Sequence, residues 1–118
     1  MSAITFEQLF LDLPSGRGDS CTLSARAAYQ AVLGDDAVLV DLRPDSARRL
    51  HGSVAPELDP LVLSPAELGS LHGRVLLICA DGRVALRTAE ALRRLGVPGV
   101  SAVAGGYAAW RAAGMPTV

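Results

Sequence analysis

The chain has 118 residues and a mass of 12.2 kDa, which is enough for one folded domain and too little for two. Half of its residues are hydrophobic, and 11 arginines against 12 acidic residues leave a net charge of −1. We therefore expect no nucleic acid and no membrane as partner, because the sequence offers no basic surface for a nucleic-acid backbone and no basic tract for an anionic membrane. The lack of lysine excludes Schiff-base catalysis and the lysine of a phosphate-binding loop.

The hydrophobic runs and the cysteines indicate a cytoplasmic protein with reduced thiols. No run approaches the ~20 residues that span a bilayer, and the N-terminus lacks the features of a secretory signal. Two cysteines far apart in sequence do not suggest a disulfide-stapled secreted domain. No metal site is predicted, because the candidate ligands contain no closely spaced pair; they are Cys21, His51, His72 and Cys79.

Residues 1–20 are predicted to be an N-terminal extension ahead of a compact domain, residues 21–118. Within the extension, residues 5–13 have the spacing of a short amphipathic helix, and residues 14–20 have the composition of a flexible connector. The domain is predicted to open with a short edge strand at 21–23. A helix follows, which Ser24 caps and Gly34 ends.

Hydrophobic runs of strand length alternate with helical patterns through the rest of the chain. The runs cover residues 38–42, 74–78 and 100–103, and helices are predicted over 44–50, 64–73, 85–95 and 106–112. The third of these helices places Leu86, Ala89, Leu92 and Leu95 on one face. Uniformly apolar strands are typical of a parallel sheet covered on both faces. The predicted fold is therefore α/β, with three layers and a mainly parallel central sheet flanked by helices.

The candidate functional residues follow two of these strands, because ligands of parallel sheets bind at the carboxyl ends of strands. Asp41 lies at one such end, and Cys79 lies at another. After Cys79 a short loop leads into a helix; its residues are Ala80, Asp81, Gly82, Arg83 and Val84. If the loop curls over the helix start, its N–H groups stabilise a thiolate and bind an incoming anion. The sulfur must then lie at the floor of a ring of peptide N–H groups, open to solvent.

Several other uses of Cys79 can be weighed on spacing. A free cysteine at a strand end is often a small apolar residue and nothing more. A disulfide oxidoreductase needs a second cysteine at position 82, where this chain has Gly82, and a cysteine-dependent phosphatase needs an arginine at position 85, where it has Ala85. A cysteine protease needs a histidine beside the thiol, and nothing in the sequence places His51 or His72 there.

Three segments together resemble the rhodanese-like domain family, in the family's order and at about its spacing. The stretch V-A-G-G-Y-A-A-W-R-A-A-G-M-P at 103–116 is similar to its closing signature, a Gly-Gly turn entering a helix with Ala-Trp and then Ala-Gly-x-Pro. The Cys79 loop resembles the family's active-site loop, and V-L-V-D-L-R at 38–43 resembles its strand ending in Asp-x-Arg. The resemblance covers residues 21–118.

The resemblance implies a sulfurtransferase that needs no cofactor. Cys79 matches the nucleophile, which takes sulfane sulfur from thiosulfate or a persulfide and passes it to a thiol, cyanide or a protein acceptor. The backbone amides of residues 80–84 match the groups that bind the persulfide or the leaving anion. Asp41 and Arg43 match a strand-end pair that supports the loop. Arg87, one helical turn beyond Arg83, is either a further support of the loop or part of a solvated helix face.

The sequence departs from the family around this site. The family's Gly-His-Ile-x-Gly-Ala turn is altered here, with His51 and Ala55 recognisable, and Ala80 and Val84 stand where a basic and a hydroxyl or basic residue are usual. Asp81 places a negative charge near the thiolate, which opposes ionisation. We therefore expect poor turnover of thiosulfate and favour a persulfide or protein donor. The departures also keep a second hypothesis open, a catalytically weak module that binds a partner protein or an anion.

Overall fold

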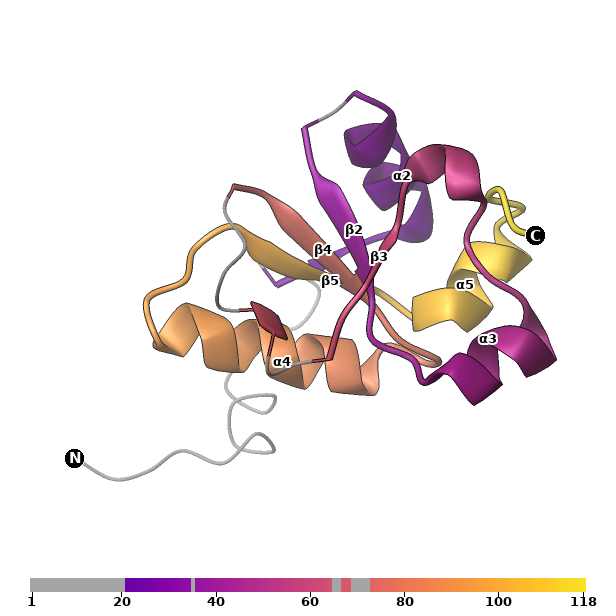
Figure 1. Cartoon of the computed structure of the whole chain (residues 1–118). Helices are drawn as coiled ribbons and strands as arrows, with labels where there is room; N and C mark the ends of the chain where they lie inside the picture. Colours follow the sequence, from indigo (N-terminus) through magenta and orange to yellow (C-terminus); the bar gives the residue numbers. More distant parts are fainter. Residues whose placement is uncertain (1–20, 35, 65–66, 69–72) are drawn as a thin grey trace.

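The computed structural model describes residues 21–34, 36–64, 67–68 and 73–118 (Figure 1). The elements in chain order are β1 (Thr22–Leu23), α2 (Ala25–Leu33), β2 (Val38–Asp41), α3 (Asp45–His51), the 3-10 helix η1 (Pro56–Leu58), β3 (Leu61–Val62), β4 (Val75–Ile78), α4 (Arg83–Arg94), β5 (Val100–Val103) and α5 (Gly106–Ala112). The predicted helix at 5–13 lies outside the described residues, as does most of the one predicted at 64–73.

Within the described part of the chain, five strands form one sheet in the order β1-β5-β4-β2-β3. Every pair of neighbouring strands is parallel. Helix α4 lies along one face of the sheet, while α2 and α5 lie on the other (Figure 1). The prediction of a three-layer α/β fold with a parallel central sheet is therefore confirmed.

The hydrophobic core is divided by the sheet into two clusters. Alternate residues of the central strands point to opposite faces, so Leu76 and Ile78 of β4 pack with α2 and α5, whereas Leu77 packs with α4. Strands β4 and β5 are buried throughout, which explains why their sequences show no polar alternation. Cys79 belongs to the α4 side of the core.

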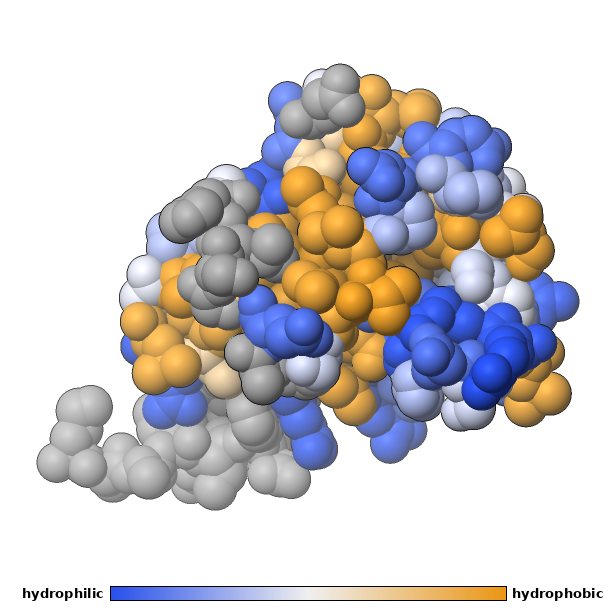
Figure 2. All heavy atoms as spheres, in the orientation of Figure 1, coloured by the Kyte–Doolittle hydropathy of each residue, from blue (hydrophilic) through white to orange (hydrophobic). Residues whose placement is uncertain are grey.

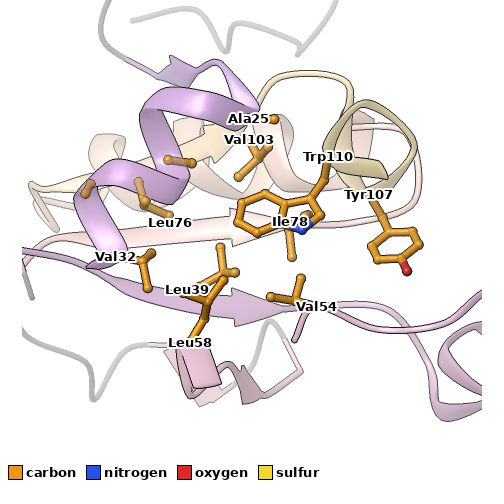
Figure 3. Packing of buried hydrophobic residues seen from close by; sticks show 12 residues of the cluster. Ala25, Val32, Leu39, Val54, Leu58, Leu76, Ile78, Val103, Tyr107 and Trp110 are labelled. Atoms are coloured by element: carbon orange, nitrogen blue, oxygen red, sulfur yellow. The ribbon is translucent and has the colours of Figure 1, made fainter. Parts of the chain in front are cut away.

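Trp110 of α5 lies in the middle of the cluster on the α2 side, between α2 and the strands (Figure 3). Its side chain is fully buried, and its ring meets the ring of Tyr29 edge to face at 6.2 Å between centroids. The indole Nε1–H donates to the carbonyl of Pro116 at 2.9 Å. The same carbonyl accepts from the backbone N–H of Ala55, so Trp110 ties the C-terminal segment to the chain after α3.

Local capping signals in the sequence are realised in the structure. The Ser24 hydroxyl accepts from the backbone N–H of Ala27 at 3.1 Å at the start of α2. Further along, the carboxylate of Glu67 accepts from the backbone N–H of Ser64 at 2.8 Å, as a capping box requires. This bond holds the pKa of Glu67 below its usual range.

Three features differ from the sequence predictions. Helix α4 begins at Arg83 rather than at residue 85. It ends before Leu95, which is 79% exposed and does not belong to the core cluster on the α4 side. Strand β3 was not predicted, because two residues at a sheet edge carry no periodic signal. Its Leu61 and Val62 are 36% and 52% exposed, and hydrophobic side chains reach the surface over β3 in Figure 2.

Candidate active site

The sulfur of Cys79 lies over the first turn of α4. Cys79 follows the last residue of β4, and the chain then reverses into α4 through Gly82, which has a positive φ of 93°. The backbone N–H of Gly82 donates to Sγ at 3.2 Å, and that of Ala85 donates at 3.3 Å. The loop therefore curls over the helix start and directs peptide N–H groups at the sulfur.

This arrangement favours a negative charge on the sulfur. The N–H groups in the first turn of a helix have no partner within the helix, and the aligned peptide dipoles place partial positive charge there. Cys79 is a free thiol, and Sγ occupies the position at which a helix N-terminus binds an anion. Hydrogen bonds to a thiolate stabilise it relative to the thiol, so the geometry supports a nucleophilic sulfur.

Access to Cys79 is narrower than the sequence analysis assumed. The residue is 5% exposed, and its side chain packs with the α4 side of the core. The ring of N–H groups is present at Gly82 and Ala85, but the expectation of a sulfur open to solvent is met only in small part. A reactant must therefore bring a slender end group to the sulfur.

The start of α5 supports the loop from behind. The backbone N–H of Tyr107 donates to the carbonyl of Cys79 at 2.7 Å, and that of Ala108 donates to the carbonyl of Ala80 at 3.1 Å. A Cβ at Gly106 would lie 2.3 Å from the carbonyl oxygen of Cys79 and 2.6 Å from the nitrogen of Gly82. The Gly-Gly turn thus allows the last helix to approach the loop closely enough to form these bonds.

Asp41 and Arg43 form a buried ion pair at the same edge of the sheet. The guanidinium of Arg43 donates to both carboxylate oxygens of Asp41, with Nη2 2.9 Å from Oδ2. Arg43 also donates to the carbonyl of Gly52, and its guanidinium stacks on the ring of Tyr107 at 4.0 Å from the centroid. The pair therefore joins the end of β2 to the turn after α3 and to α5.

Strand register brings this pair and the cysteine loop together. Asp41 pairs with Ile78, the residue before Cys79, and the N–H of Leu42 donates to the carbonyl of Ile78 at 2.9 Å. Side chains that follow adjacent parallel strands at the same level emerge at one edge. Asp41 and Arg43 thus connect to the cysteine loop through backbone and ring contacts.

The other predicted site residues lie on the outer side of the loop. The side chains of Asp81 and Arg83 are largely exposed and form an ion pair at 3.5 Å, and Asp81 also accepts from the backbone N–H of Arg83. Val84 is exposed, and Arg87 lies one turn further along α4 with an exposed side chain. The positive charge of Arg83 thus offsets the negative charge of Asp81, so Asp81 repels a thiolate at Cys79 less strongly.

Sequence reasoning missed two contributors to the site. Ala85 was weighed as the position that lacks an arginine, but its backbone N–H donates to Sγ. Tyr107 entered the sequence analysis only as part of the closing signature, but it holds the cysteine peptide through its N–H and Arg43 through its ring. The available signal was the helix start itself, because the third residue of a helix always has an N–H without a helical partner.

The residues whose positions the structure describes also limit the kind of site. They contain no group of three or more His, Cys, Asp or Glu side chains placed to hold a metal ion. None of the helices in this part of the chain has the length and hydrophobicity needed to cross a bilayer.

Comparison with known proteins shows the family. The model of the rhodanese-like domain matches residues 24–113. The uncharacterized protein slr1261 of Synechocystis sp. (strain ATCC 27184 / PCC 6803 / Kazusa) is 30% identical over 108 residues, which are 90% of this chain and 60% of that protein. The chain therefore spans less than two thirds of this relative.

Two solved structures illustrate the shared fold. The polysulfide-sulfur transferase homodimer of Wolinella succinogenes aligns with a TM-score of 0.70 at 22% identity, over 86% of this chain and 80% of its own. RPA3614 of Rhodopseudomonas palustris CGA009, a protein of unknown function described as a possible tyrosine phosphatase, aligns with a TM-score of 0.71 at 21% identity, over 83% and 84%. At these identities the likeness concerns the fold alone. With three quarters of its length matched by the family model, the chain belongs to the rhodanese-like domain family.

Proposed function

We propose that the protein is a sulfurtransferase that carries sulfane sulfur on Cys79. The observation that carries this proposal is the pair of backbone N–H groups, from Gly82 and Ala85, that donate to Sγ. They stabilise the thiolate that attacks and the anionic persulfide that results. Family membership and the fold shared with a polysulfide-sulfur transferase support the same chemistry.

The reaction consists of two half-reactions that need no external oxidant. In the first, the Cys79 thiolate attacks the outer sulfur of a donor R–S–SH. A bond forms between Sγ and that sulfur, the S–S bond of the donor breaks, and R–S⁻ leaves with the bonding electrons. In the second, an acceptor thiolate attacks the outer sulfur of the Cys79 persulfide, which forms the acceptor persulfide and returns the Cys79 thiolate.

The donor is proposed to be a persulfide rather than thiosulfate. Thiosulfate would leave as sulfite, a dianion that needs cationic or hydroxyl groups beside the loop. Ala80 and Val84 supply neither, and the guanidinium of Arg83 is already engaged by Asp81. Both donors present a terminal sulfur, and the narrow access to Cys79 favours the one in which a slender R–S chain follows that sulfur over the one in which a tetrahedral sulfonate group follows it.

Phosphate chemistry is disfavoured by the same loop. A cysteine-dependent phosphatase clamps its substrate with an arginine side chain from the position that Ala85 occupies. Ala85 presents a buried methyl group to the core and only its N–H to the sulfur. The second candidate is a catalytically weak module that binds a partner protein or an anion. It is supported by the burial of Cys79 and by the altered loop.

Intact mass spectrometry after incubation with a persulfide donor separates these functions. We expect the wild-type chain to gain one sulfur atom and to lose it on addition of a thiol acceptor. Cys79→Ser should gain none, whereas Cys21→Ser should behave like wild type, since Cys21 stands before the edge strand β1. No gain with any of several donors would leave the binding module as the explanation. Loss of the gain in Cys21→Ser alone would show that the wrong thiol was chosen.

A further inference from the structure

A pocket of about 530 Å³ opens beside the cysteine loop, and nothing in the transfer chemistry described above accounts for it. It lies between α3 and α5 and reaches the loop at Ala80, the residue that follows Cys79. Most of its lining consists of small side chains and one aromatic ring; these are Ala47, Ala80, Ala108, Ala112 and Tyr107. Small alanine side chains on two facing helices leave the space that larger residues would fill.

The remaining lining residues are two arginines and a histidine, and no carboxylate lines the pocket among the described residues. The guanidinium of Arg43 is already bound to Asp41 and stacked on Tyr107, so it forms part of the pocket wall and is not the group that pairs with a ligand. His51 ends α3 with an exposed ring. Arg111 is exposed, lies one helical turn beyond Tyr107 on the same face of α5, and forms no ion pair within the part of the chain that the structure describes.

The pocket is therefore lined by apolar surface together with cationic side chains. Organic ligands bind in clefts of about 300–1,000 Å³ that combine apolar walls with a few polar groups. One water takes up about 30 Å³ of liquid, so a small inorganic anion would leave most of this pocket to solvent. A ligand that matches the pocket has several carbon atoms and a negative charge placed to meet Arg111.

We propose that this pocket binds the organic part of the sulfur donor and acceptor, and that both are low-molecular-weight thiols carrying a carboxylate. This inference rests on the proposed function, since a thiol and its persulfide differ by the sulfur atom that Cys79 exchanges. The carbon skeleton lies on the alanines and Tyr107, and the carboxylate pairs with the Arg111 guanidinium. Arg111 is thus a specificity-determining residue, which selects a carboxylate-bearing persulfide over a neutral one.

The test compares two donors that differ only in charge, the persulfide of N-acetylcysteine and that of N-acetylcysteine amide. The single-turnover rate of sulfur addition to Cys79 is followed by intact mass. Because Arg111 is exposed, we expect the wild-type chain to react about fivefold faster with the carboxylate donor, the most that one solvent-exposed ion pair confers. In Arg111→Gln the ratio of the two rates should fall to within about twofold of unity.

Arg49→Gln is the matched control, because Arg49 is an exposed arginine of α3 that does not line the pocket. It should keep the wild-type ratio. The inference is overturned if the wild-type chain shows no preference, or if Arg111→Gln retains it.

A binding measurement keeps this inference separate from the proposed transfer reaction. S-methyl-N-acetylcysteine, which cannot donate sulfur, is titrated into Cys79→Ser while backbone amide resonances are recorded. We expect saturable shifts at Ala80, Ala108 and Ala112 that Arg111→Gln removes. Shifts without sulfur loading in the wild-type chain would reject the transferase and keep the pocket assignment. Sulfur loading on Cys79 without charge preference and without shifts at the pocket residues would keep the transferase and reject the pocket assignment.

Discussion

The carbonyl of Cys79 accepts a hydrogen bond of 2.7 Å from the backbone N–H of Tyr107 in α5. The proposed nucleophile is therefore held by a helix that comes after α4 and β5 in the chain. On the other side of the same residue, Gly82 and Ala85 donate to Sγ. The peptide and the side chain of Cys79 are thus each fixed by backbone groups. This geometry is independent of any polar side chain in the loop, which explains how it tolerates Ala80 and Val84.

Replacing Gly106 by alanine should damage the site and the fold together. The new Cβ would lie 2.3 Å from the carbonyl oxygen of Cys79, against backbone that cannot move without displacing the loop. We expect a loss of about 2–3 kcal/mol in the free energy of unfolding in urea, with loss of sulfur loading. Gly114→Ala is the control, because Gly114 also has positive φ but no atom of the described residues lies within 4 Å of its Cβ position. It should cost about 1 kcal/mol; equal costs would refute close approach as the cause.

Neutralising Asp41 should be far more harmful than neutralising Asp81. Asp41→Asn leaves the buried guanidinium of Arg43 without its counter-charge, and removing one partner of a buried pair costs about 3–5 kcal/mol. Asp81→Asn breaks an exposed pair, whose loss costs at most about 1 kcal/mol. Urea unfolding of the two variants measures the difference. Similar small costs would mean that the Asp41 pair contributes no more than a surface one.

The double variant Asp41→Asn/Arg43→Met tests whether the harm comes from the orphaned charge. It should recover part of the stability lost in Asp41→Asn, because no unpaired cation remains buried. Arg48 lies 3.8 Å from Asp41 and is less buried, so it can turn toward solvent in either variant. Additive losses would contradict this account.

Glu90 is expected to lower stability at neutral pH. Its carboxylate oxygens are buried and have no hydrogen-bond partner among the described residues, and burial raises the pKa of Glu90 although Arg94 opposes the rise. A raised pKa means that the folded state binds the proton more tightly than the unfolded state. The contribution of Glu90 to stability is therefore complete at acidic pH and is lost as pH rises from about 4.3 through the folded pKa.

Glu90→Gln should consequently stabilise the protein at pH 7, by on the order of 1 kcal/mol, and should lose this advantage at acidic pH. The measurement is the difference in unfolding free energy between variant and wild type across that pH range. Glu57→Gln provides the control, since Glu57 is exposed in η1. A destabilising effect of Glu90→Gln at pH 7 would contradict the prediction.

Trp110 should contribute in two separable ways. Trp110→Ala removes a fully buried ring and should cost about 3–5 kcal/mol. Trp110→Phe keeps most of the volume but removes the hydrogen bond to Pro116, which should cost about 1–2 kcal/mol. Because Pro116 also accepts from Ala55, the Ala55 amide should exchange with solvent faster in Trp110→Phe. Unchanged exchange there would show that Trp110 does not hold the C-terminal segment.

Local sequence patterns were enough to predict most of the elements and the edge of the sheet at which the site forms. Uniformly apolar runs indicated the buried strands β2, β4 and β5, because only strands covered on both faces lack polar alternation. Ser24 and Gly34 marked the ends of α2 because capping depends on neighbouring residues alone. The position of Cys79 at a strand end followed from the same local pattern.

The surroundings of the Cys79 sulfur could not be predicted from such local patterns. The N–H of Ala85 on Sγ, the bond from Tyr107 to Cys79 and the limited access to the thiol all depend on how closely α4 and α5 approach the loop. The edge strand β3 and the exposure of Leu95 likewise depend on which neighbours are present, since two-residue pairing and a helix end leave no periodic trace. Hydrophobic period and caps are local properties of a chain, whereas approach, register and access are set by contacts between residues distant in sequence.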